Sequence, residues 1–124
     1  MTTTSPQIAE KLYEEGTKRG FHVLDAPVTG GDTGAREGTL SILVGGDKSD
    51  YTNCHELFEA MGTNINYEGS AGCGQHCKLA NQIMIAGALS GVCEALTYAK
   101  EKGLDLNVFS KSVATGAAGS RQFD

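Results

Sequence analysis

The sequence predicts an α/β unit over residues 1–70, followed by an all-helical portion over residues 71–124. Short β-favouring runs alternate with amphipathic segments before residue 71, whereas the pattern after it is helical throughout. The 17 glycines of this 124-residue chain concentrate between positions 30 and 46 and between 69 and 74. Such clusters mark tight turns and places where the backbone approaches a ligand closely.

The first element expected is a helix. It begins at Pro6, with Ser5 as its N-cap, and runs to Gly20. The run 21–25 is short, β-favouring and followed by a proline, which predicts a strand that stops before a glycine-rich loop. A second strand is predicted over residues 40–44.

Helices dominate the remainder of the chain. Residues 47–60 have apolar side chains at helical spacing and predict an amphipathic helix, and 64–67 predict a short third strand. One long helix is expected over residues 74–102, closed by Gly103 in the position that ends many helices. A further helix is expected to begin near Leu106.

Charge and hydropathy exclude some classes of partner. The net charge is -5 and the sequence has no block of lysine and arginine, so we expect no nucleic-acid partner. The apolar stretch 83–99 contains Ser90, Glu94 and Thr97 and is rich in glycine and alanine, which predicts a buried helix and not a membrane span. The polar start of the chain resembles no secretory signal, so we expect a cytoplasmic protein with reduced cysteines.

Lys78 is the first candidate for a catalytic residue. It and Glu94 are the only formally charged side chains within residues 75–98. In the first turn of an apolar helix, the helix dipole and the surroundings favour release of the ammonium proton, which suits a general acid/base. Asn81 and Gln82 share the helix face of Lys78 and could hold a substrate oxygen. Alternatively, the lysine stem only covers apolar surface at a helix end.

The loop Thr29-Gly30-Gly31 is the second candidate. It follows a predicted strand, and ligands of α/β folds bind beyond the carboxyl ends of strands. Two successive glycines allow backbone N–H groups to converge on an anion, and the threonine hydroxyl adds a donor, so a carboxylate is the expected ligand. The alternative is an ordinary turn with no ligand.

The cysteines and histidines offer a metal site as a third interpretation. Thiolate and imidazole are the usual ligands of zinc, and the chain has such side chains at Cys54, His55, Cys73, His76 and Cys77. The sequence contains no pair of CxxC knuckles, however, and Cys77 and Cys93 have the pattern of small core residues. We therefore expect no metal.

Three motifs, read together, resemble the β-hydroxyacid dehydrogenase family. They are DAPVTGG at 25–31, AREGTLSILVGGD at 35–47 and GCGQHCKLANQ at 72–82, and their order and spacing are similar too. The resemblance implies the C-terminal part of a Rossmann-type NAD(P)-binding domain followed by the first helices of an all-α domain. It also implies hydride transfer between NAD or NADP and a short β-hydroxyacid such as 3-hydroxyisobutyrate or 2-hydroxy-3-oxopropionate.

The resemblance assigns roles to particular residues. Thr29-Gly30-Gly31 would bind the substrate carboxylate, and Lys78 would be the catalytic acid/base. Asn81 would help to hold the substrate, although the related 6-phosphogluconate dehydrogenases leave the assignment open between Asn81 and Gln82. Thr3 corresponds to a position that contacts the nicotinamide cofactor in this family.

The chain also departs from the family pattern. Members begin with a strand, a GxGxxG turn and a helix that cradle the dinucleotide, and this sequence has no such half. We therefore expect a central fragment, inactive by itself, of an enzyme that forms a homo-oligomer. The alternative is a non-catalytic structural piece whose long helix is an oligomer interface.

Overall fold

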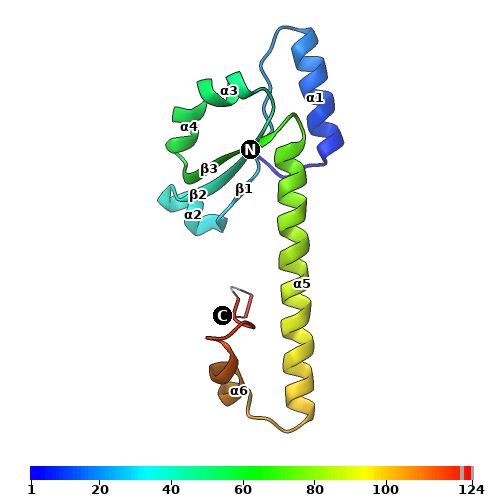
Figure 1. Ribbon diagram of the computed structural model, residues 1–124, viewed down its shortest axis with the longest axis vertical. Helices are drawn as coiled ribbons and strands as arrows, with labels where there is room; N and C mark the ends of the chain where they lie inside the picture. Colours follow the sequence, from blue (N-terminus) through cyan, green and yellow to red (C-terminus); the bar gives the residue numbers. More distant parts are fainter. Residues whose placement is uncertain (121, 124) are drawn as a thin grey trace. The chain divides into compact units, whose positions relative to one another are not determined.

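A computed structural model describes residues 1–120, 122 and 123 of the chain. In order, its elements are α1 (Pro6–Lys18), β1 (Val28–Thr29), α2 (Gly31–Glu37), β2 (Leu40–Gly45), α3 (Lys48–Asn53), α4 (His55–Glu59), β3 (Gly62–Gly69), α5 (Cys73–Glu101) and α6 (Leu106–Val113) (Figure 1). They form two compact units, Met1–Ala80 and Asn81–Asp124, so the division falls inside α5. The predicted α/β class is confirmed.

The first unit is built on a mixed three-stranded sheet in the order β1-β2-β3. β1 runs antiparallel to β2, with Val28 opposite Ile42, whereas β2 and β3 are parallel. Helices α3 and α4 form the crossover between the two parallel strands, as such connections require. The predicted strands 40–44 and 64–67 are confirmed, each lying within a slightly longer strand.

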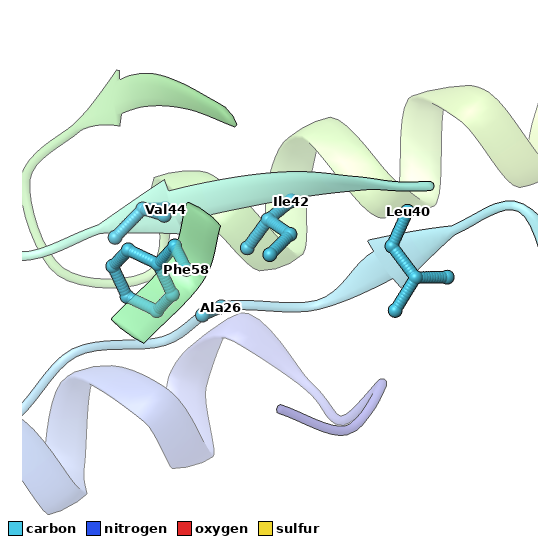
Figure 2. Packing of buried hydrophobic residues seen from close by; sticks show 5 residues of the cluster. All are labelled: Ala26, Leu40, Ile42, Val44 and Phe58. Carbon is cyan, nitrogen blue, oxygen red and sulfur yellow. The ribbon is translucent and has the colours of Figure 1, made fainter. Parts of the chain in front are cut away.

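The core of this unit lies on β2. Leu40, Ile42 and Val44 are buried and pack with Ala26 and with Phe58 of α4 (Figure 2). Ile42 and Val44 are 0% exposed. Full burial of such a side chain is worth about 1.5–3 kcal/mol, so β2 is the element that holds the unit together.

Local capping signals explain the ends of the helices. Ser5 Oγ accepts a hydrogen bond from the Ile8 backbone N–H at 3.2 Å, as an N-cap does. Beyond α5, Gly103 has φ +75, the left-handed conformation that glycine adopts without strain. Asp105 caps α6 by accepting from the N–H of Asn107 at 2.8 Å. The helices predicted over residues 6–20, over 74–102 and from Leu106 are confirmed as α1, α5 and α6.

Other predicted elements are wrong. Residues 21–25 form no strand; Asp25 only makes an isolated bridge with Gly45, and the strand begins later, at Val28. In the described part of the chain no strand pairs with residues 21–24. Their β-favouring sequence therefore has no partner strand with which to form the backbone hydrogen bonds of a sheet. The predicted helix 47–60 is divided into α3 and α4 at Cys54, whose φ of −95 and ψ of 1 leave the helical region.

The predicted burial of the long helix is also wrong for this chain. Ile83 is 72% exposed and Met84 is 68% exposed, and Cys93 is exposed as well. The described residues leave these side chains exposed. By length and composition alone, α5 could cross a membrane, which is weak evidence for a span.

Two glycines let the start of α5 approach the sheet closely. A Cβ at Gly74 would collide with the Leu43 carbonyl oxygen and would lie 2.8 Å from Asp25 Oδ2. A Cβ at Gly45 would lie 2.8 Å from the Gly74 backbone nitrogen. The helix start and the end of β2 therefore meet backbone to backbone, with no room for a side chain.

Replacing Gly74 by alanine tests this close contact. We expect Gly74→Ala to lower the free energy of unfolding of the intact protein by about 2 kcal/mol, since an overpacked site must move its backbone. Gly87→Ala is the matched control, because Gly87 lies in the same helix with nothing within 4 Å of a Cβ. Alanine there should stabilise by about 0.5–1 kcal/mol through helix propensity. Urea unfolding measures both; equal effects would contradict the close contact.

Candidate active site

Asp25 holds the start of α5. Its Oδ1 accepts from the Gly72 backbone N–H at 2.8 Å, and its Oδ2 accepts from the Gln75 N–H at 2.9 Å. The first N–H groups of a helix have no partner within the helix, and a carboxylate satisfies them with charge-assisted hydrogen bonds. The Asp25 backbone is in turn bonded in both directions to Gly45 at the end of β2. This residue therefore fixes the helix on the sheet.

Lys78 meets the glycine loop in the structure. Its Nζ donates a hydrogen bond of 2.8 Å to the carbonyl oxygen of Val28, the residue immediately before Thr29. The side chain is half-buried. The two candidates of the sequence, one on a helix and one on a loop 50 residues away, are thus brought together. Lys78 lies in the second turn of α5 and not in the first as predicted, because the helix begins at Cys73.

The loop connects β1 to α2. Thr29 ends the strand, Gly30 has φ +132 and Gly31 begins the helix with φ +66. Both positive φ values are ones that side chains rarely adopt, which explains the glycine pair. No described residue forms a hydrogen bond with the Thr29 hydroxyl, so that donor is available to a ligand. Backbone N–H groups in such a turn suit an anion.

Gln75 ties the start of the chain to α5. Its Oε1 accepts from the Thr4 backbone N–H at 3.0 Å, and its Nε2 donates to the Thr2 carbonyl at 2.8 Å. Thr3, the predicted cofactor contact, lies between these two points and is itself exposed. The segment that carries Thr3 is therefore held by the same helix that carries Lys78.

Asn81 and Gln82 belong to the second unit. They follow Lys78 in α5, and the Asn81 amide Nδ2 lies 3.5 Å from Gln82 Oε1 as a long hydrogen bond. Asn81 is half-buried and Gln82 is exposed. Their roles in holding a substrate stay predictions.

Sequence reasoning missed the three groups that assemble this site. They are the Asp25 carboxylate, the Val28 carbonyl and the Gln75 side chain. Asp25 and Gln75 lie within two of the motifs that carry the family resemblance, so the sequence shows their residue types. It does not show their hydrogen-bond partners, which lie 47 or more residues away in the chain. Only a motif shared with related chains would have marked them.

The residues of the zinc interpretation show no ligand cluster. Among residues 1–120, 122 and 123, no group of three or more histidine, cysteine, aspartate and glutamate side chains is placed to hold a metal ion. The four cysteines are free thiols.

Two family profiles match the chain. The profile described as the NAD binding domain of 6-phosphogluconate dehydrogenase matches residues 1–69. The profile described as the NAD-binding domain of NADP-dependent 3-hydroxyisobutyrate dehydrogenase matches residues 72–124. Together they cover nearly the whole sequence.

Curated relatives match nearly the full length of the chain. An uncharacterised oxidoreductase of Bacillus subtilis is 50% identical over 97% of this chain and 42% of the relative. The 2-hydroxy-3-oxopropionate reductase of Escherichia coli is 43% identical over 98% of this chain and 41% of the relative. The chain thus spans well under half the length of these relatives.

Solved structures give the same result. The 3-hydroxyisobutyrate dehydrogenase of Mycobacterium tuberculosis, solved with L-serine, matches with a TM-score of 0.89 at 30% identity. The match covers 97% of this chain and 41% of that one. The 3-hydroxyisobutyrate dehydrogenase of Salmonella typhimurium matches with a TM-score of 0.86 at 25% identity. Both support the predicted Rossmann-type domain.

Cys77, next to Lys78, is a poor nucleophile. Burial raises the pKa of its thiol, and the nearby negative charge of Glu68 raises it further. A thiol reacts as its thiolate, so a raised pKa keeps Cys77 protonated at neutral pH. Cysteine chemistry is therefore disfavoured beside the lysine.

The rate of alkylation tests this environment. We expect the reaction of Cys77 with iodoacetamide to rise with pH along a curve whose midpoint lies above the ordinary thiol pKa of 9.0. Glu68→Gln should lower the midpoint, because it removes a negative charge that opposes the thiolate. Glu14→Gln, an exposed change on α1, should not. Peptide mapping by mass spectrometry measures the rates, and a midpoint at or below 9.0 would contradict the interpretation.

Proposed function

The chain belongs to the β-hydroxyacid dehydrogenase family, and from that premise we propose that the intact protein is an NAD(P)-dependent oxidoreductase. It transfers a hydride between the cofactor and a short β-hydroxyacid, such as 3-hydroxyisobutyrate or 2-hydroxy-3-oxopropionate. The hydrogen bond of 2.8 Å between Lys78 Nζ and the Val28 carbonyl carries the proposal. It brings the Lys78 amine, the proposed proton-transferring group, close to a loop that suits a carboxylate.

A short hydroxyacid would bridge these two groups. Its carboxylate would lie at Thr29-Gly30-Gly31, where the hydroxyl and the backbone N–H groups are donors. In such a molecule the β-hydroxyl is only a few bonds from the carboxylate. This suits the position of Lys78 Nζ, which bonds the residue just before the loop. The family resemblance would also give Asn81, or Gln82 in its place, a part in holding the substrate.

Lys78 would move the hydroxyl proton. In the direction of oxidation, the hydride leaves the hydroxyl-bearing carbon, the O–H bond breaks, and the Lys78 amine takes the proton. In reduction, the ammonium returns that proton to the carbonyl oxygen. The Val28 carbonyl accepts from Nζ in the ammonium form and so directs the side chain toward the loop.

The residues of the first unit fit one end of the cofactor. NAD or NADP, when bound, accepts or donates the hydride. Thr3 would contact the nicotinamide end, and support comes from its exposure and from the bonds that hold Thr2 and Thr4 on either side. The choice between the two cofactors depends on parts of the family fold that this sequence does not include. Because the chain spans well under half the length of its relatives, we expect the 124 residues by themselves to be inactive.

A second candidate is a structural role. The exposed apolar side chains of α5, among them Ile83 and Met84, favour a surface that another chain covers in a homo-oligomer. Under this alternative Lys78 would only cover apolar surface with its stem. A cytoplasmic location is compatible with both proposals and stays a prediction.

Removal of the lysine amine tests the acid/base role of Lys78. In the intact protein we expect Lys78→Ala to fold normally and to lose about 10²–10⁴-fold in kcat, the usual contribution of general acid/base catalysis. Lys100→Ala, an exposed lysine in the last turn of α5, is the control and should keep full turnover. Steady-state kinetics and far-UV circular dichroism measure activity and folding. Unchanged turnover in Lys78→Ala would overturn the acid/base role of Lys78, and no turnover in the wild-type protein would leave only the structural candidate.

The carboxylate site has its own test. Thr29→Val keeps the shape of the side chain and removes the donor, so we expect KM for the hydroxyacid to rise about tenfold, as for the loss of one hydrogen bond to a charged group. kcat should stay within about twofold, because the lysine remains. Thr63→Val, at an exposed position of β3, is the matched control. An unchanged KM in Thr29→Val would place the carboxylate elsewhere.

A further inference from the structure

Gln75 connects three parts of the first unit, although it has no part in the proton transfer. Its backbone N–H donates to the Asp25 carboxylate, its Oε1 accepts from Thr4, and its Nε2 donates to Thr2. The residue is 2% exposed. A buried primary amide that satisfies both of its ends in this way is held in one geometry, because rotation would leave a buried polar group without a partner.

The two side-chain bonds of Gln75 hold the backbone around Thr3. One goes to the residue before Thr3 and the other to the residue after it, at 2.8 Å and 3.0 Å. The Thr3 side chain is meanwhile exposed. Gln75 therefore fixes the backbone of this segment and leaves the side chain between the two bonds available to a ligand.

Gln75 and Lys78 act from one face of α5. Residues three apart in a helix are neighbours on its surface. Gln75 forms hydrogen bonds with the segment 2–4, and Lys78 donates a hydrogen bond to the carbonyl of Val28, the residue just before the glycine loop. A single turn of helix, fixed on the sheet by Asp25, thus sets the spacing between the two segments.

We propose that Gln75 is a positioning residue, which sets the Thr3 segment against the nicotinamide end of the cofactor in register with Lys78. The inference rests on the proposed function, in which Thr3 contacts the nicotinamide. Hydride transfer requires reacting atoms about 3–3.5 Å apart, and a misplacement of about 1 Å can lower the rate by a factor of about 100. The Gln75 amide acts through the cofactor's position and not on the proton.

Cofactor fragments provide the test. Gln75→Met in the intact protein keeps the length of the side chain and removes both hydrogen bonds. We expect Kd for NADH or NADPH, whichever the wild type binds, to rise about tenfold. Kd for the corresponding fragment without nicotinamide, ADP-ribose or its 2′-phosphate, should change less than about twofold. Isothermal titration measures both. Gln7→Met, the same change at an exposed position of α1, should alter neither.

A second variant keeps the test decisive if Gln75→Met does not fold. Gln75→Glu retains the acceptor for the Thr4 N–H and loses the donor to the Thr2 carbonyl. We expect a smaller rise in Kd for the dinucleotide, again with unchanged binding of the fragment. A merely structural role for Gln75 would weaken both ligands together or neither.

The outcomes separate this inference from the proposed function. Selective loss of dinucleotide affinity in the Gln75 variants supports the positioning role. If the wild type turns over and requires Lys78, but the variants bind dinucleotide and fragment in the wild-type ratio, the positioning role is overturned and the proposed function stands. If the wild type binds neither NADH nor NADPH, both are overturned.

Discussion

The carboxylate of Asp25 joins the sheet to the long helix, and the rest of the candidate site depends on this junction. It accepts from two backbone N–H groups at the start of α5, while the Asp25 backbone pairs with Gly45 at the end of β2. The junction is close because Gly45 and Gly74 carry no side chains. Any longer side chain there would push the helix away from the strand end and carry the functional groups with it.

One face of α5 holds two segments of the first unit, the one around Thr3 and the one that leads into the glycine loop. Lys78 bonds the carbonyl just before the glycine loop, and Gln75 bonds the backbone on both sides of Thr3. Each bond joins a side chain of α5 to backbone, so the segments are placed by the helix and not by their own side chains. This division leaves the Thr3 side chain exposed and the Thr29 hydroxyl without a hydrogen-bond partner among the described residues, as the proposed binding of a cofactor and a substrate requires.

Local signals were sufficient for α1, α5 and α6, but not for every helix or strand. Ser5, Asp105 and Gly103 act through neighbours within a few residues, so the limits of their helices could be predicted from the sequence. The run 21–25 failed because strand formation depends on a partner, which local propensity cannot supply. α2 was missed because its glycines lower helix propensity, while packing against β2 compensates.

The sequence by itself determined the family, the α/β class and the residue types of the site, because motif order and local periodicity are properties of the linear chain. Tertiary structure alone decided that Lys78 meets the loop at Val28, and that Asp25 and Gln75 hold the helix and the Thr3 segment. The physical reason is the same for each contact. Hydrogen bonds between residues 47 to 73 positions apart form only when the fold brings their backbones together, and no local pattern encodes that distance.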